Sequence, residues 1–225
     1  LRLIPPADGK WWHVDGRGDY WRMFEFIAGS ESFDQVRSPE DFYQSARAFG
    51  HFQCLLADYP VENLEETIPD FHNTPKRFEA LRKAAEEDAC GRAGDVRGEI
   101  RFFEEREEEM KAAMEQYQAG RLPLRVTHND TKLNNILFDR ETGEALCIVD
   151  LDTVMPGFSI FDFGDSIRFG ANTALEDEKD LNKISLSLEL FESYTKGFLE
   201  GCEGSLTETE KRMLPAGAKL MTMEC

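Results

Sequence analysis

One stretch of the sequence carries residue types whose spacing could support phosphate chemistry. Asp130 lies two positions after His128 and is followed by Lys132 and Asn135, and a second carboxylate, Asp150, comes after the next apolar run. Phosphoryl transfer needs a carboxylate that orients the attacking hydroxyl and accepts its proton, a cation near the moving phosphate, and metal ions that neutralise its charge. Magnesium prefers carboxylate and amide oxygens. The set therefore predicts a site for phosphate and magnesium.

Short extended segments must position these groups. Residues 124–127 form an extended run that leads into His128. Residues 136–138 and 145–149 have the pattern of two strands joined by a turn. A loop followed by a strand pair allows Asp130 and Asp150 to face one cleft from opposite sides. We therefore expect a small hairpin at the centre of the site.

Helical patterns occupy most of the remaining chain. We expect a buried amphipathic helix after Ser38, a second helix after Thr74, and one long helix between Gly98 and Gly120. A capping-box pattern at 207–210 predicts a last helix, and residues 184–188 alternate like a short strand. The face expected to be buried on the first of these helices comprises Phe42, Ala46, Phe49, Leu55 and Leu56.

The first residues of the chain have a different pattern. Residues 11–14 and 20–27 flank a turn rich in glycine and aspartate, which predicts a β-hairpin. An isolated two-stranded hairpin is only marginally stable in water. We therefore expect these strands to need a further sheet or the body of the protein, and we interpret the chain as part of a longer protein.

Composition excludes several classes of function. The 225 residues include 26 basic and 44 acidic side chains, a net charge of −18 that repels nucleic acids and anionic membrane surfaces. No apolar run approaches the roughly 20 residues of a membrane-spanning helix. The five cysteines are scattered and form no C-x-x-C pair, which argues against a disulfide framework or a zinc site. We expect a monomeric cytoplasmic protein.

The sequence resembles a known superfamily in an ordered set of residues. Residues 128–135 are similar to the H-x-D-x-K-x-x-N catalytic loop of the protein-kinase-like superfamily, and Asp150 lies where that superfamily has its metal-binding aspartate. The D-L-D sequence at 150–152, in place of D-F-G, favours the aminoglycoside-phosphotransferase-like small-molecule kinases over protein kinases. Within these, residues 150–157 and 162–170 look most like bacterial N-acetylhexosamine 1-kinases.

The resemblance covers most of the chain and implies its fold and organisation. It implies an α+β protein-kinase-like fold with a mostly helical C-terminal lobe and a catalytic hairpin. Residues 1–29 would be a remnant of the N-terminal lobe, with its hairpin and hinge, and residues 30–225 the catalytic lobe, cut short at its end. The family's glycine-rich loop, strand lysine and helical glutamate would precede Leu1. We therefore expect this chain to bind ATP weakly and to be inactive alone.

The resemblance also implies roles for the matching residues. Asp130 would be the catalytic base, with Lys132 near the transferred phosphate or the sugar. Asn135 and Asp150 would be the magnesium ligands. Asp162 would support the catalytic loop through backbone hydrogen bonds.

Less specific positions complete the expected site. His128 would also support the loop, and the hinge at Glu25, Phe26 and Ile27 would meet the adenine of ATP. Asp152 and Arg168 are possible substrate contacts. Asp152 could equally be a cap, and Arg168 could equally be the buried partner of a carboxylate.

Three functions remain open from the sequence. The first is an ATP- and Mg²⁺-dependent kinase that phosphorylates the anomeric hydroxyl of N-acetylglucosamine or N-acetylgalactosamine to give the sugar 1-phosphate. The second keeps this chemistry but takes an aminoglycoside, choline, homoserine or another small hydroxyl compound. The third is a kinase-like binding module without catalysis. The missing nucleotide loop favours this third function, and the presence of Asp130, Asn135 and Asp150 opposes it.

Overall fold

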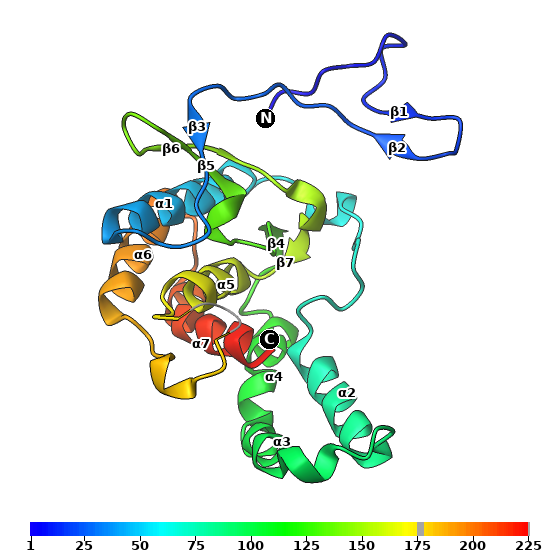
Figure 1. The fold of residues 1–225 in the computed structure, drawn as a ribbon, viewed down its shortest axis with the longest axis vertical. Coiled ribbons are helices and arrows are strands. Elements are labelled where there is room, and N and C mark those ends of the chain that lie inside the picture. The colour runs from blue at the N-terminus through cyan, green and yellow to red at the C-terminus, as the bar shows by residue number, and fades with distance from the viewer. Residues whose placement is uncertain (175–177, 225) are drawn as a thin grey trace.

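The computed structural model describes residues 1–174 and 178–224, and it shows a helical body from which an extended arm leaves at the amino end (Figure 1). The helices are α1 (Pro39–Leu55), α2 (Thr74–Glu87), α3 (Arg97–Glu104), α4 (Glu107–Gln118), α5 (Ser159–Gly170), α6 (Leu188–Gly201) and α7 (Glu208–Glu224). The strands are β1 (His13–Val14), β2 (Tyr20–Trp21), β3 (Ser30–Glu31), β4 (Arg125–Thr127), β5 (Ile136–Asp139), β6 (Ala145–Ile148) and β7 (Met155–Gly157). Short 3-10 turns are η1 (Val61–Asn63), η2 (Ala93–Val96), η3 (Leu133–Asn135), η4 (Leu151–Thr153) and η5 (Leu181–Lys183).

Helix α1 begins where the sequence predicts it. The side chain of Ser38 accepts a hydrogen bond from the backbone N–H of Asp41 at 3.1 Å, and a proline follows at the first helical position. Phe42 and Phe49 are buried as expected, but Leu55 is 65% exposed. The expectation for Leu55 is wrong because this residue lies about a third of a turn away from the buried face.

Helix α5 lies at the centre of the body, between α1, α6 and α7 (Figure 1). It can approach α7 closely because glycines meet at the contact: a Cβ added to Gly164 would lie 2.3 Å from the carbonyl oxygen of Gly217. On its other side, the buried ring of Phe163 packs edge-on against Tyr194 and Phe198 of α6. The side chains of α5 are therefore held in a closely packed environment.

In the described residues the strands form three small antiparallel sheets, two on the body and one on the arm. One has the order β3-β5-β6, with Ile136 opposite Ile148 and a bulge between Leu137 and Phe138. Strand β4 pairs with β7, and β1 pairs with β2. The hairpin that the sequence predicts at 136–149 is therefore confirmed.

The long helix expected between Gly98 and Gly120 is divided into α3 and α4. Arg106 at the junction leaves helical geometry, with φ −116° and ψ 13°. Its guanidinium donates to the carbonyl of Phe102 at 2.8 Å, which satisfies an acceptor at the end of α3. Arg106 therefore helps to end α3.

Two features near the carboxyl end differ in how well the sequence predicts them. The strand expected at 184–188 is reduced to a single bridge between Leu186 and Asn172. It cannot continue because Ser187 caps α6, where its side chain accepts a hydrogen bond from the N–H of Leu190. The capping box at 207–210 is confirmed. Glu210 donates its N–H to the hydroxyl of Thr207 at 3.2 Å, and its carboxylate accepts the N–H of Thr207 at 2.7 Å.

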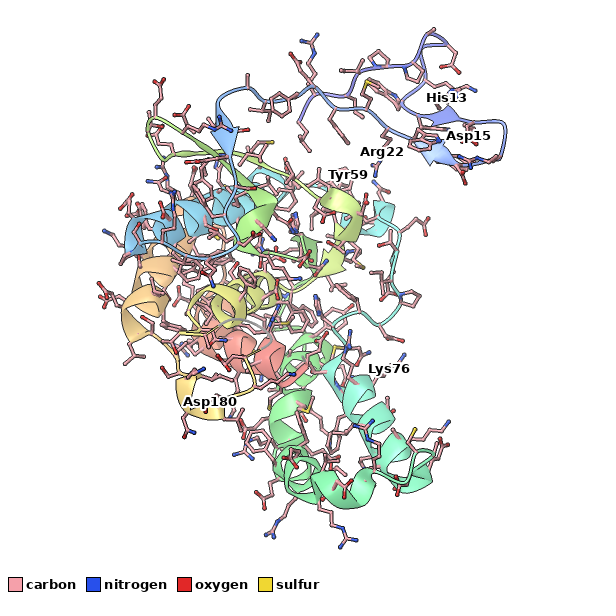
Figure 2. All side chains as sticks on the ribbon, in the orientation of Figure 1. His13, Asp15, Arg22, Tyr59, Lys76 and Asp180 are labelled. Carbon is pink, nitrogen blue, oxygen red and sulfur yellow. The ribbon has the colours of Figure 1, made fainter. Side chains whose placement is uncertain are left out.

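The arm, residues 1–29, extends away from the body and exposes aromatic side chains. Tyr20 is 75% exposed and Phe26 is 85% exposed. Figure 2 labels Arg22 on the side of the arm that faces the body, and its guanidinium lies 2.6 Å from the carboxylate of Asp152 in η4. Both partners of this ion pair are more than half exposed, so it stabilises the arm's position only weakly.

Candidate active site

The catalytic loop, residues 128–132, runs from β4 to η3 and is held by a buried aspartate of α5. One carboxylate oxygen of Asp162 accepts the backbone N–H of Asn129 at 2.8 Å. The other accepts the backbone N–H of His128 at 3.0 Å and the side-chain amide of Gln53 at 2.7 Å. Two hydrogen bonds therefore connect the start of the loop to Asp162, and a third connects Asp162 to Gln53 of α1.

The environment of Asp162 has opposing effects on its ionisation. Complete burial raises the pKa of its carboxyl group above the usual value, whereas the backbone N–H groups and Gln53 oppose that shift. The backbone donors remain at fixed positions because α5 is packed on all sides. This carboxylate is therefore a structural anchor, away from solvent.

A second anchor lies one turn further along α5. Asp165 accepts the backbone N–H of Thr131 at 2.8 Å, and the hydroxyl of Thr131 donates to the carbonyl of Asp162 at 2.6 Å. Arg168 donates to the second oxygen of Asp165 through Nη2 at 2.9 Å and Nε at 3.2 Å. Arg168 is thus a largely buried partner of a carboxylate, and its role as a substrate contact stays a prediction.

His128 is buried and connects the loop to the strand pair. Its Nε2 donates to the carbonyl of Val149 at 3.0 Å, and its Nδ1 accepts the N–H of Asp130 at 3.4 Å. The rings of Phe49 and Phe52 meet the imidazole edge-on, with centroids 5.4 Å and 6.0 Å away. The imidazole thereby fixes the distance between the loop and the end of β6.

The structure brings Asp130, Lys132 and Asn135 together. The amide nitrogen of Asn135 donates to the backbone oxygen of Asp130 at 2.8 Å and to its carboxylate at 3.1 Å. Lys132 Nζ lies 3.5 Å from the other carboxylate oxygen of Asp130. The side chain of Asp130 is 29% exposed, so it is accessible to a substrate and also held in place.

Asp150 follows β6 after one residue, Val149, which is hydrogen-bonded to this group. The N–H of Val149 donates to the carbonyl of Asn135 at 2.9 Å. This bond fixes the backbone beside the loop just before Asp150. Asp150 is exposed and has φ 60° and ψ 60°, a left-handed conformation that few non-glycine residues adopt. Such backbone strain is common at functional sites.

The donor set can be tested against the needs of magnesium. Among residues 1–174 and 178–224, no three His, Cys, Asp or Glu side chains are grouped so that they could hold a metal. Magnesium at nucleotide sites needs only one or two protein oxygens, because phosphates and water supply the rest. Asn135 uses its nitrogen as a donor to Asp130, so its amide oxygen and the carboxylate of Asp150 are the atoms that fit this role.

Two further predicted groups lie near the arm. Asp152 is 73% exposed and forms the ion pair with Arg22 described above, so a role in substrate binding stays a prediction. At the expected hinge, the N–H of Glu25 donates to the carbonyl of Arg2 at 2.9 Å, and the carbonyl of Ile27 accepts from Ser30. Phe26 points into solvent with 85% exposure. Adenine binding at Glu25, Phe26 and Ile27 also stays a prediction.

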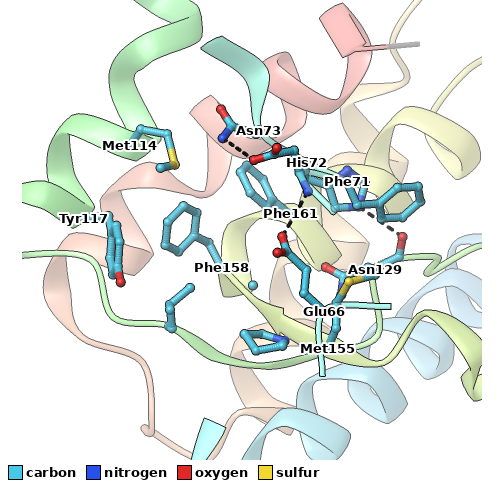
Figure 3. A pocket seen from close by; sticks show the side chains of 14 residues that line it. Glu66, Phe71, His72, Asn73, Met114, Tyr117, Asn129, Met155, Phe158 and Phe161 are labelled. Atoms are coloured by element: carbon cyan, nitrogen blue, oxygen red, sulfur yellow. Dashed lines mark hydrogen bonds between the residues drawn. The ribbon is translucent and has the colours of Figure 1, made fainter. Parts of the chain in front are cut away.

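A cavity of about 220 Å³ lies beside the catalytic loop, between β7, α4 and the segment before α2 (Figure 3). Aromatic rings form much of its wall, and Glu66 and Asp70 contribute carboxylates. Asn129 of the catalytic loop also lines it. The aromatic residues are Phe71, Tyr117, Phe158 and Phe161, with His72 beside them.

Sequence reasoning missed two residues that help to hold the loop, one through Asp162 and one directly. Gln53 donates to Asp162, and His72 donates to the carbonyl of Asn129 at 3.2 Å. Gln53 carried a signal, since it is a polar residue on the apolar face of a predicted helix. His72 carried no signal in the sequence, because its partner lies 57 residues away.

The fold and the site together define a class of protein: a protein-kinase-like lobe with a catalytic loop between a buried aspartate and a two-stranded hairpin. The chain belongs to the phosphotransferase enzyme family, which it matches over residues 6–183. The predicted α+β protein-kinase-like fold is confirmed, and so is the predicted family. The acceptor is a separate question.

Two solved structures share this fold. A microcompartment-associated aminopropanol kinase matches with a TM-score of 0.58 and 19% identity, over 98% of this chain and 64% of that one. The choline kinase of Cryptosporidium parvum Iowa II matches with a TM-score of 0.53 and 16% identity, over 90% of this chain and 62% of that one. The chain therefore spans less than two thirds of either kinase. Within the two described ranges, no helix has the length and apolar character needed to cross a membrane.

Proposed function

We propose that this chain is the catalytic lobe of an ATP- and Mg²⁺-dependent kinase that converts an N-acetylhexosamine to its 1-phosphate. The observation that carries the proposal is the grouping of Asp130, Lys132 and Asn135 on a loop anchored by Asp162. In such a site, one carboxylate is free to receive a proton and its neighbours handle phosphate charge. A binding module without chemistry would have no physical need for this arrangement.

Each residue has a defined role in the proposed reaction. Asp130 orients the anomeric hydroxyl and accepts its proton as the oxygen forms a bond to the terminal phosphorus of ATP. The bond from that phosphorus to the bridging oxygen breaks, and ADP leaves. Lys132 stabilises the charge of the transferred group. Asn135 and Asp150 would hold magnesium, which would supply positive charge to neutralise the phosphates. Glu25, Phe26 and Ile27 border the adenine.

The N-acetylhexosamine acceptor is supported by residues 150–157 and 162–170, which resemble the corresponding blocks of bacterial N-acetylhexosamine 1-kinases. These residues form η4, β7 and most of α5, which are the elements that surround the catalytic loop. Glucosamine and galactosamine derivatives have apolar ring faces, and the aromatic cavity beside Asn129 suits such faces. The acceptor is neutral, so it needs no charged partner.

A small amino alcohol is the second candidate acceptor. Glu66 and Asp70 place carboxylates beside the aromatic rings of the cavity, and this combination suits an ammonium group. Lys76 lies 2.7 Å from Asp70 and offsets part of that charge, which leaves Glu66 as the residue to test. The kinases of similar fold are named for aminopropanol and choline.

An acceptor screen on the intact protein distinguishes these candidates. We expect ATP-dependent conversion of N-acetylglucosamine or N-acetylgalactosamine, with the product identified as a 1-phosphate by ³¹P NMR. Glu66→Gln serves as the matched variant: it leaves a neutral acceptor's kcat/KM unchanged and lowers that of an ammonium acceptor. Phosphorylation of choline or aminopropanol, without any N-acetylhexosamine product, would reject the lead proposal in favour of the second.

We also propose that residues 1–29 belong to a nucleotide-binding lobe that residues 30–225 need for activity. Support comes from the exposed aromatic residues of the arm, such as Tyr20 and Phe26, which provide apolar surface for further strands. ATP binding by residues 1–225, compared with the intact protein by calorimetry, tests this. Equal affinity would contradict it.

A further inference from the structure

His72 lies just before α2, and both of its ring nitrogens are engaged. Nε2 donates to the backbone carbonyl of Asn129 at 3.2 Å, the contact drawn as a dashed line in Figure 3, and Nδ1 lies 2.9 Å from the carboxylate of Glu224 at the end of α7. The side chain is only 9% exposed. The rings of Phe71 and Phe161 lie against it, with centroids 4.3 Å and 5.4 Å away. The imidazole is thus held from several directions.

The carbonyl that His72 binds belongs to the peptide group between Asn129 and Asp130. The N–H of the same peptide group donates to Nδ1 of His128. Two histidines, one from the segment before α2 and one from the loop itself, therefore hold the two ends of a single peptide group. Because a peptide group is planar and rigid, fixing its oxygen and its nitrogen fixes the plane from which the next side chain leaves.

This plane sets the direction of the proposed catalytic base. Asn129 has φ 64°, so the chain reverses sharply just before Asp130. Asp162 holds the N–H of Asn129 on the core side, but that bond does not restrain the peptide group that follows. His72 restrains the oxygen of that peptide group and His128 restrains its nitrogen.

We propose that His72 is a positioning residue for phosphoryl transfer, which fixes the Asn129–Asp130 peptide group and thereby the carboxylate of Asp130. The proposal rests on the proposed function of Asp130 as the base. His72 acts through the loop and does not contact the reacting atoms. Removing its contact with the loop lowers kcat, because the base is misaligned, and leaves nucleotide affinity unchanged.

A purely structural role for His72 would act through its other nitrogen. Glu224 is also paired with Arg77, at 2.9 Å, so this side of the imidazole belongs to an ion-pair cluster between α2 and α7. The two roles can be separated because the two nitrogens are at different distances from the backbone. An asparagine at this position places its amide near the site of Nδ1, whereas a glutamine reaches the site of Nε2.

The experiment compares His72→Gln with His72→Asn in the intact protein. We expect His72→Gln, which can still donate to Asn129, to retain kcat close to wild type. We expect His72→Asn, which loses the hydrogen bond to Asn129, to have a kcat about tenfold lower, the size of effect expected from one lost hydrogen bond. Its KM for ATP should be unchanged. Arg77→Gln and Glu224→Gln alter the ion-pair cluster and leave the loop contact intact, so both retain wild-type kcat.

The reverse order, with asparagine more active than glutamine or with Glu224→Gln as impaired as His72→Asn, would overturn the inference. Amide hydrogen exchange of residues 127–132 gives a second readout that does not depend on turnover. Faster exchange in His72→Asn than in His72→Gln supports the positioning role, and equal exchange contradicts it. If the wild-type protein transfers no phosphate to any acceptor, the proposed function fails, and the exchange result still shows whether His72 holds the loop.

Discussion

Replacing Asp162 by asparagine tests how the catalytic loop is anchored. The carboxylate accepts three hydrogen bonds: the N–H of Asn129 on one oxygen, and the N–H of His128 and the amide of Gln53 on the other. An asparagine has one acceptor oxygen and one donor nitrogen. In its better orientation the oxygen faces His128 and Gln53, and the new NH₂ group then faces the N–H of Asn129. One buried backbone donor is left without an acceptor.

The size of the effect follows from these contacts. A buried donor without an acceptor costs about 1–3 kcal/mol, and the two remaining bonds lose the contribution of the charge. The loss is partly offset, because burial of the charged carboxylate is unfavourable, as the raised pKa of Asp162 indicates. We therefore expect Asp162→Asn to lower the free energy of unfolding by about 2 kcal/mol. For a domain of this size, that corresponds to a melting temperature lower by about 4–8 °C.

Thermal and urea unfolding of Asp162→Asn measure this effect, and hydrogen exchange of residues 127–132 localises it. Asp139→Asn is the matched control. Asp139 also accepts two backbone N–H groups, from Glu141 and Thr142, but it lies in a turn near the surface, where water and asparagine can replace the lost bonds. The reasoning would be refuted if Asp162→Asn unfolded at the wild-type temperature with unchanged exchange in the loop.

Other parts of the structure lead to further predictions. Asn135→Ala, which removes a proposed ligand, should raise the Mg²⁺ concentration for half-maximal activity by at least about tenfold in a metal titration. Gly164→Ala places a Cβ 2.3 Å from a carbonyl of α7 and should destabilise the fold by about 1–3 kcal/mol, whereas Gly98→Ala, with no atom nearby, should stabilise it slightly in the same melting experiment. Burial raises the pKa of Glu210, but bonds from Arg125 and others outweigh it and lower the pKa below its usual 4.5. Ionised Glu210 therefore stabilises the fold above that pH, and the stability is lost as the pH falls through the folded-state pKa. Glu210→Gln should flatten this acid dependence in pH-resolved unfolding. Because it leaves the largely buried Arg125 without a charged partner, it should also destabilise the fold at pH 7 by about 3–5 kcal/mol.

The sequence predicts those parts of the fold whose signals are local. The cap at Ser38, the capping box at Thr207 and the hairpin after Asn135 all depend on neighbours within a few residues, and the structure contains each of them. The spacing of the catalytic loop is local as well, which is why the family could be inferred from it. Features that depend only on neighbouring residues can therefore be predicted from the sequence without knowledge of the fold.

Features that depend on packing could not be predicted in the same way. Arg106 ends α3 with its own guanidinium, and Leu55 faces solvent although it continues an apolar run. Gln53 binds the anchor Asp162, and His72 binds the loop itself, and nothing near either residue in sequence identifies its partner. Such contacts are determined when helices pack, so only the structure reveals them.

The turnover of Asp130→Asn tests the central claim most directly. The substitution keeps the size of the side chain and leaves the backbone oxygen that Asn135 binds, so the fold should survive with a melting temperature within about 3 °C of wild type. If Asp130 is the base, kcat for the best acceptor should fall by at least about 100-fold in the intact protein. Turnover within about twofold of wild type, in a correctly folded variant, would contradict the account.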